Sequence, residues 1–339
     1  MSDDRPVPDG PFEDAPSAEA PAGDRDVRGE AVQSFRRVAW SRGAGCSDVA
    51  SLLATETSPR IVGDLRKACI GQRVDVLVTR KLSSFDLVPV VVPHHVALDE
   101  IESVTAAVGT GPHSLFAAAV AVRVAATLDV PAVVATVART AEDLPAARER
   151  LSGLKEAGLR ARTIALTGPS PVDLVESLDR RSLLVVGAPG GSWLQRHLFG
   201  AGHRLIVSAP AGALVVRSQH RRCFHLASDS AGFVVGTDLL VKDALQVTPL
   251  PVVPVAESGR LVGVVRREAL ASADGGDAVA SVMEPPRFAR ADEALDVAIG
   301  LRGFFRGSPV PVVDDDDTLI GVITASAVDE ADGNGASAP

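Results

Sequence analysis

The residues best suited to chemistry in this chain are glycines that follow an apolar run at residues 183–186. Nine residues separate Gly190 from Gly200, and the full set is Gly187, Gly190, Gly191, Gly200 and the adjoining Ala201. Glycines after a strand let the backbone turn with positive φ and bring its N–H groups near a phosphate. A helix that begins near residue 202 would add its positive end. The spacing predicts an anion site made of backbone amides, with no side chain taking part.

A second glycine pattern lies between an apolar run and a helical segment, with Gly109, Gly111 and Ser114 at its fixed positions. A dinucleotide-binding turn has similar glycines and an acid about 20 residues further on. That acid is missing, because the next apolar run ends at Val137 and Arg139 follows shortly after it. We therefore do not expect a dehydrogenase.

The other chemistry-bearing residues predict neither a metal centre nor a catalytic site. The run from Asp314 to Asp317 lacks the alternating ligands of a calcium loop and is expected to be a hairpin turn. No serine or cysteine stands in a nucleophile context such as G-x-S-x-G. His220 and His225 belong to a basic stretch expected to be an exposed linker. Three cysteines without CxxC spacing are expected to be separate thiols, namely Cys46, Cys69 and Cys223. The chain is not expected to be an enzyme.

Alternating strands and helices over residues 101–218 must position the glycines. Helical segments are predicted at 113–128, 141–157 and 171–180, and apolar runs at 104–108, 130–137, 163–166, 183–186 and 213–216. This order predicts a parallel sheet with helices on its faces and ligands at the carboxyl ends of its strands. The strand at 213–216 is expected to be a sheet edge, and two copies could pair through it or through packing of the repeat at 227–330 described below.

With these elements in place, residues 101–218 resemble the universal stress protein (USP) family. The family signature, G-x2-G-x9-G followed by Ser or Thr, is similar to GAPGGSWLQRHLFGA at 187–201. The resemblance implies a parallel-sheet adenine-nucleotide α-hydrolase-like fold. In ATP-binding members it implies adenine contact near the end of the first strand, here Gly109, and phosphate contact at the glycines. Gly109 occupies the place of the usual Asp, and Ala201 that of the hydroxyl residue.

Residues 227–330 contain an internal repeat with a shift of 58 residues and no gap. Residues 251–255 fall on 309–313, and residues 261–265 fall on 319–323. Each copy is a strand, a polar turn, a second strand and a helix, with a further helical segment before it. Because each copy alone would expose an apolar face, the two copies are expected to pack together.

The repeat resembles a tandem pair of CBS domains, an α+β module whose members bind adenosyl ligands between the two copies. The resemblance rests on PLPVVPVAESGRLVGVVRREAL, SPVPVVDDDDTLIGVITASAV and the joint VASVMEPP. It implies a ligand contact by Thr324, which follows the last strand. Arg266 stands at the equivalent place in the first copy, and Ala269 and Ala327 replace the Asp that binds ribose.

The remaining segments complete the expected domain organisation. Residues 31–100 are predicted to be a degenerate USP-like half repeat, with a helix at 60–69 and strands at 74–78 and 87–92. Residues 1–30 carry nine acids and three arginines with few large apolar side chains, and they are expected to be a disordered acidic tail. Residues 331–339 are expected to be a second disordered tail.

Composition excludes several classes of partner. The chain has 339 residues, a net charge of −9 and only 4% aromatic residues. Nucleic-acid binding relies on counterion release and base stacking, so no nucleic acid is expected. No apolar stretch is long enough for a membrane span, and no signal-like segment follows Met1, so a cytoplasmic protein is expected.

Together these patterns predict a stress-response regulator that couples a nucleotide-binding USP-like domain to a CBS pair. ATP or AMP is the expected ligand, without a metal. An unidentified protein is the expected partner, and a homodimer the expected assembly. The alternative is an interaction or dimerisation scaffold that keeps both folds and binds neither ligand.

Overall fold

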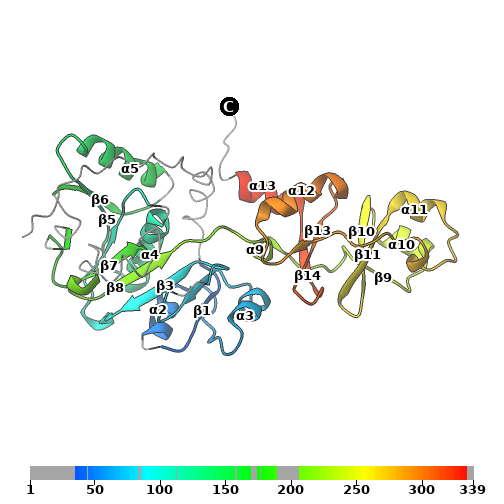
Figure 1. The fold of residues 1–339 in the computed structure, drawn as a ribbon, viewed down its shortest axis with the longest axis horizontal. Coiled ribbons are helices and arrows are strands. Elements are labelled where there is room, and N and C mark those ends of the chain that lie inside the picture. The colour runs from blue at the N-terminus through cyan, green and yellow to red at the C-terminus, as the bar shows by residue number, and fades with distance from the viewer. Residues whose placement is uncertain are drawn as a thin grey trace, which may run out of the picture.

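The computed structural model describes residues 35–333, apart from residues 44, 83–84, 112, 157–158, 169–173, 176 and 189–205. The predicted N-terminal tail therefore lies outside the described residues. The described chain forms an α/β lobe followed by two smaller α+β units in a row (Figure 1). The last helix, α13 (Ala325–Gly333), extends three residues into the segment expected to be the C-terminal tail.

The α/β lobe is built on an eight-stranded sheet in the order β1-β2-β3-β8-β7-β4-β5-β6. Its strands are β1 (Val38–Trp40), β2 (Val76–Val78), β3 (Val90–His94), β4 (Ser103–Ala107), β5 (Ala132–Ala138), β6 (Arg162–Thr167), β7 (Ser182–Gly187) and β8 (Ala213–Arg217). The five strands predicted between residues 101 and 218 are all present. Strands β4, β5 and β7 are mutually parallel, with β4 between the other two, so their carboxyl ends meet at one edge.

The prediction that residues 213–216 form an edge strand is wrong. Strand β8 is paired with β7 on one side and, antiparallel, with β3 on the other, so that Val91 lies opposite Val216. Strand β3 of the same chain thus covers the edge that was expected to pair with a second copy. Gly212 permits this close approach, because its φ of 92° is unfavourable for other residues and a Cβ there would lie 2.4 Å from the His95 carbonyl oxygen.

Four main helices pack on the sheet. They are α2 (Cys46–Leu53), α3 (Leu65–Gly71), α4 (Ser114–Leu128) and α5 (Leu144–Glu156). The alanine-rich α4 is buried along most of its length and lies beside α2, to which Arg123 donates hydrogen bonds at the Leu53 and Ala54 carbonyls. Strand β1 and helix α2 were not predicted. Helix α3 begins five residues later than predicted, because the Asp64 side chain caps it.

The C-terminal part consists of two similar three-stranded sheets. The first contains β9 (Val235–Gly236), β10 (Val252–Glu257) and β11 (Arg260–Arg266), with α10 (Val241–Val247) and α11 (Arg267–Ser272). The second contains β12 (Ala289–Arg290), β13 (Val310–Val313) and β14 (Leu319–Ile323), with α12 (Leu295–Phe305) and α13. In each sheet the long central strand pairs parallel to the short strand and antiparallel to its hairpin partner. The predicted 58-residue repeat is therefore a structural repeat.

The acidic run forms the predicted hairpin turn. One Asp314 carboxylate oxygen accepts hydrogen bonds from the backbone N–H groups of Asp316 and Thr318, each at 2.9 Å. Such side-chain contacts are typical of Asp at the start of a turn.

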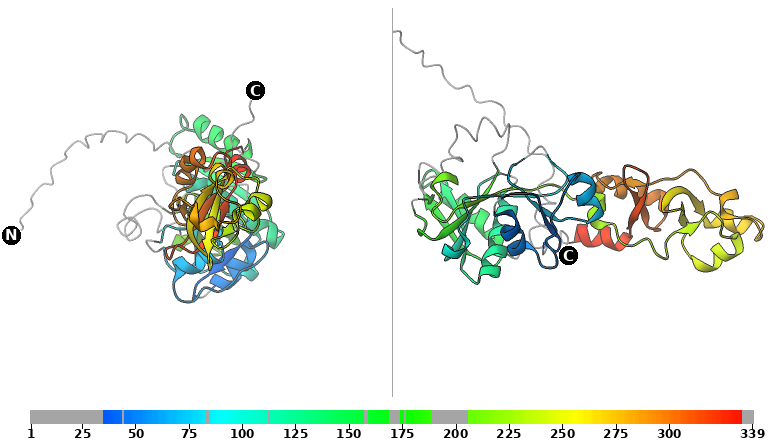
Figure 2. Two further views of the ribbon diagram at one scale, coloured as in Figure 1. Left: turned by 90° about the vertical axis from the view of Figure 1, so that its right-hand side faces the viewer. Right: turned by 90° about the horizontal axis from the view of Figure 1, so that it is seen from below.

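Residues 39–88 and the second C-terminal unit share one hydrophobic core. The short helix α9 (Cys223–Leu226) enters this core through Phe224, which is fully buried. The core combines residues of both parts, among them Cys69, Ile70, Leu77, Val310 and Ile323. Helix α3 lies beside this unit at the middle of the molecule (Figure 2, right). The two parts are therefore joined by packing as well as by the chain.

Candidate functional site

A cavity of about 620 Å³ opens at the carboxyl ends of β4, β5 and β7. This volume lies in the range of small-molecule sites. Small apolar side chains form much of its wall, including Ala107, Ala135, Ala138, Ala146 and Val186. The cavity lies where parallel α/β sheets bind ligands. It is the place expected from the order of the strands.

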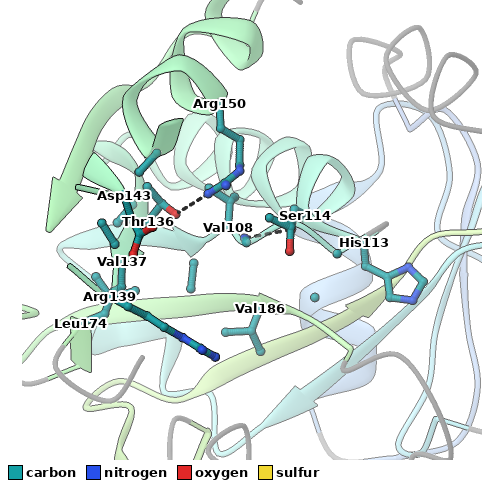
Figure 3. Close-up of a pocket in the computed structure, with 18 of the residues that line it drawn as sticks. Val108, His113, Ser114, Thr136, Val137, Arg139, Asp143, Arg150, Leu174 and Val186 are labelled. Carbon is teal, nitrogen blue, oxygen red and sulfur yellow. Dashed lines mark hydrogen bonds between the residues drawn. The ribbon is translucent and has the colours of Figure 1, made fainter. Parts of the chain in front are cut away.

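Two arginines that were not among the predicted site residues line the β5 side of this cavity. Arg139 directly follows β5 and is exposed, whereas Arg150 lies on α5 and is half-buried. Arg150 Nη1 donates a hydrogen bond of 3.3 Å to the hydroxyl of the buried Thr136. Figure 3 shows the Arg150 side chain descending from α5 toward Thr136, and the Arg139 side chain extending toward Val186.

The predicted anion site was made of backbone amides alone, whereas two guanidinium groups also line the cavity. A signal for both arginines was present in the sequence. Arg139 comes immediately after a predicted parallel strand, where ligand-contacting residues gather, and Arg150 lies three residues beyond the buried Ala147 on the next helix.

Among the described residues, the carboxylate that lines the cavity belongs to Asp143 and is engaged by its own loop. The Asp143 carboxylate accepts hydrogen bonds from the backbone N–H and the hydroxyl of Thr140, at 3.1 and 2.9 Å. The Thr140 hydroxyl oxygen in turn accepts from the Asp143 backbone N–H. These bonds close the turn that leads into α5. The charged lining that the structure describes thus consists of two guanidinium groups and one carboxylate.

Gly187, predicted to contact phosphate, ends β7 and lines the cavity. Its φ is not positive, contrary to the expectation for this glycine. A Cβ at Gly187 would lie 3.0 Å from Cβ of His113, so the residue must be small because β7 approaches the start of α4 closely. Gly190, Gly191, Gly200 and Ala201 lie outside the described residues.

His113 faces away from the cavity despite lining its rim (Figure 3). Its Nδ1 accepts a hydrogen bond of 3.2 Å from the Ser218 backbone N–H. Burial, and then the nearby charge of Arg217, lower the pKa of His113. The imidazole therefore ties the start of α4 to the chain that follows β8, and it is neutral at neutral pH.

Gly109 lies at the mouth of the cavity and is sterically free. Its backbone N–H donates a hydrogen bond of 3.0 Å to the Ser114 hydroxyl oxygen, and a Cβ placed on it would meet no atom within 4 Å. The structure thus places Gly109 and Gly187, two of the predicted site residues, around one cavity. A larger side chain at Gly109 would point into open space.

Thr324 lies in the second C-terminal unit, away from this cavity. Its hydroxyl oxygen accepts a hydrogen bond of 3.2 Å from the Ala327 backbone N–H at the start of α13. At the equivalent place in the first unit, Arg266 donates a 2.8 Å hydrogen bond to Glu284, and its guanidinium lies 4.7 Å from the Phe304 ring centroid. The guanidinium of Arg287 lies 4.4 Å from the same ring. The two equivalent positions are therefore chemically different.

Neither a metal cluster nor a membrane helix is found in the part of the chain that the structure describes. None of its His, Cys, Asp and Glu side chains gather in groups of three or more that could hold a metal ion. None of its helices is both long and apolar enough to cross a membrane.

Comparison with known proteins gave structural likenesses alone. No family model matches the sequence, and no curated protein matches it. Similar solved structures include the cytosolic domain of the Mg²⁺ channel MgtE in complex with ATP, with 25% identity over 32% of this chain and 47% of that chain and a TM-score of 0.28. This chain thus spans about half the length of that domain.

Two further structures are similar over nearly their whole length. A CBS domain pair/ACT domain protein from Thermotoga maritima is 21% identical over 33% of this chain and 95% of its own, with a TM-score of 0.31. CBSX2 from Arabidopsis thaliana is 26% identical over 33% of this chain and 94% of its own, with a TM-score of 0.30. CBSX2 has also been solved in complex with AMP. Each of these likenesses covers about a third of this chain.

Proposed function

We propose that this protein is a regulatory sensor of adenine nucleotides, in which a USP-like domain binds the nucleotide and a CBS pair is coupled to it. The observation that carries the proposal is the cavity at the carboxyl ends of β4, β5 and β7. Its small apolar wall suits a flat base, and its polar groups suit a phosphorylated ligand. The glycine signature that resembles the USP family begins at the same cavity, with Gly187.

Two features support the CBS assignment within this proposal. One is the 58-residue repeat, whose copies fold into two sheets of the same pairing pattern. The other is the resemblance of both copies to the CBS sequence pattern. The shared core around Phe224 supplies the coupling, because a ligand that favours one packing of the two parts shifts the population of that packing.

A direct test is calorimetric titration of the full chain with ATP, AMP and S-adenosylmethionine. We expect heat with at least one of the three, and we expect nucleotide to copurify with protein isolated without added ligand, where mass spectrometry identifies it. Absence of binding heat for all three ligands would refute the sensor function.

The alternative function is an interaction scaffold that binds no nucleotide, and two observations favour it. In the first C-terminal unit Arg266 takes the place of the expected Thr and is already engaged by Glu284 and Phe304. Gly109 also lacks the carboxylate that the USP resemblance would place there. The scaffold predicts that none of the three ligands raises the melting temperature of the protein.

A further inference from the structure

We infer that Arg139 and Arg150 hold a phosphate group of the ligand, at the β5 side of the cavity. This inference rests on the proposed nucleotide function for the identity of the ligand. It differs from the glycine signature, which would place the phosphates by backbone amides at the β7 side. The ligand class is therefore a nucleotide rather than an unphosphorylated nucleoside.

The first support is that neither guanidinium group has an anionic partner among the residues that the structure describes. Within the described part of the chain, neither Arg139 nor Arg150 forms an ion pair. The nearest carboxylate of the lining, that of Asp143, is engaged by Thr140. A half-buried guanidinium without a counter-charge favours an anion from solution, and its planar fork matches the oxygens of a phosphate.

The second support is that the Arg150 guanidinium is held in place. Its Nη1 bond to Thr136 uses one donor and leaves the other N–H groups free to bind a ligand. Thr136 is 2% exposed and belongs to β5, so the anchor is part of the sheet. A held guanidinium loses less conformational entropy on binding than a freely moving side chain.

The third support is how the two arginines are placed. Arg139 follows the carboxyl end of β5, and Arg150 projects from α5, which packs against β5 and β6. Both side chains line the cavity, Arg150 from α5 above it and Arg139 from the end of β5, on two different elements (Figure 3). Small apolar residues line much of the rest of the cavity, and its volume of about 620 Å³ leaves room for a base and ribose as well as the phosphate.

The experiment compares nucleotide binding by the full chain and by arginine variants in calorimetric titrations. The ligands are ATP, AMP, adenosine and inorganic tripolyphosphate. The variants are Arg139→Ala, Arg150→Ala and Arg150→Lys, with Arg148→Ala as the matched control, because Arg148 is exposed on α5 and does not line this cavity. Thermal melts of each variant without ligand establish that it is folded.

We expect each alanine variant to lose about tenfold or more of the ATP affinity, as for a charged hydrogen bond. Arg150→Lys should lose less, because it keeps the charge but not the fork. Arg148→Ala should bind ATP as the unchanged chain does, and adenosine should bind weakly to all of them. Added salt should weaken ATP binding most where both arginines are present.

The outcomes separate this inference from the proposed function. If ATP binds with equal affinity to the unchanged chain and to folded Arg139→Ala and Arg150→Ala, the arginine inference is overturned and the sensor function stands. Arginine-dependent binding of tripolyphosphate without binding of ATP or AMP would support the anion site and refute the nucleotide function. Failure of both ATP and tripolyphosphate to bind the unchanged chain would overturn the inference.

Discussion

Of the two glycines that line the cavity, Gly187 has almost no space for a side chain, whereas Gly109 has ample space. At Gly187 the backbone of β7 approaches His113 so closely that any Cβ would meet the His113 Cβ at 3.0 Å and its carbonyl carbon at 3.3 Å. At Gly109 the same addition meets nothing within 4 Å. A glycine in a signature can therefore serve packing between two elements rather than a turn of positive φ.

This difference predicts the effect of the same substitution at the two positions. Gly187→Ala should lower the free energy of unfolding by about 1–3 kcal/mol, because β7 and α4 must separate to admit the methyl group. Gly109→Ala should change it by less than about 0.5 kcal/mol. Urea denaturation of both variants measures the two values. An equal effect of the two substitutions would contradict the packing role of Gly187.

At the scale of elements, the central feature is the antiparallel pairing of β3 with β8. Five register pairs, from Val90 with Arg217 to His94 with Ala213, join strands β1 to β3 to the five strands β4 to β8. At the other end of the sheet, residues 57–59 cover the outer edge of β1 by accepting hydrogen bonds from Val38 and Trp40. One edge is thus covered and β8 is internal, which removes the surface on which edge-to-edge dimerisation was expected.

Gly212 is the point at which this pairing is most sensitive to substitution. Gly212→Ala would place a methyl group against the His94 and His95 carbonyls at a φ of 92°, so we expect a loss of more than about 2 kcal/mol in unfolding free energy.

Gly153→Ala is the matched control for that substitution. Gly153 lies exposed in α5, and a Cβ there meets no atom within 4 Å. The same change should stabilise the protein by about 0.5–1 kcal/mol, since alanine favours helix. Urea denaturation gives both values, and a stable Gly212→Ala variant would mean that the approach of β3 to β8 is not as close as described.

At the scale of the whole molecule, the joint between the α/β lobe and the C-terminal units is a packed interface. Around the shared core, Lys67 pairs with Asp316 at 3.1 Å, and Arg73 donates a 3.0 Å hydrogen bond to the Ile320 carbonyl. The lysine pair is exposed and contributes little to stability. The apolar core and the buried Phe224 therefore hold the joint, and the acidic turn adds specificity of contact.

His225 makes this joint sensitive to pH. The residue was expected in an exposed linker, but its ring stacks on Phe224 at 4.0 Å between centroids, and its Nδ1 accepts a 3.0 Å hydrogen bond from the Arg222 backbone N–H. Burial is the main cause that lowers the pKa of His225 to about 4, against a hydrogen bond with the Val74 backbone that raises it.

Protonation of His225 therefore opposes folding. The unfolded chain takes up this proton near pH 6.5 and the folded chain near pH 4, so stability present above pH 6.5 is lost as the pH falls between these values. The loss should reach on the order of 3 kcal/mol. In His225→Asn, whose side-chain oxygen can accept the Arg222 hydrogen bond, the unfolding free energy should fall less between pH 7 and pH 5. Parallel pH profiles for the two proteins would contradict this role.

Much of the fold could be predicted from short stretches of sequence. The strands between residues 101 and 218, helices α4 and α5, and the repeated hairpins follow from apolar periodicity and turn residues, which are properties of neighbouring residues. The position of the cavity follows from the same order of strands, and Gly109 and Gly187, two of the predicted site residues, line it.

Contacts between distant residues required the folded structure. Val91 and Val216 are far apart in the chain, and no local pattern distinguishes a free edge from one that another segment covers. The same reason applies to Arg150 beside Thr136 and to Phe224 in the core that it shares with residues 39–88. An apolar run in the sequence indicates that one face of a strand or helix is buried. Which segment packs against that face depends on the fold of the whole chain.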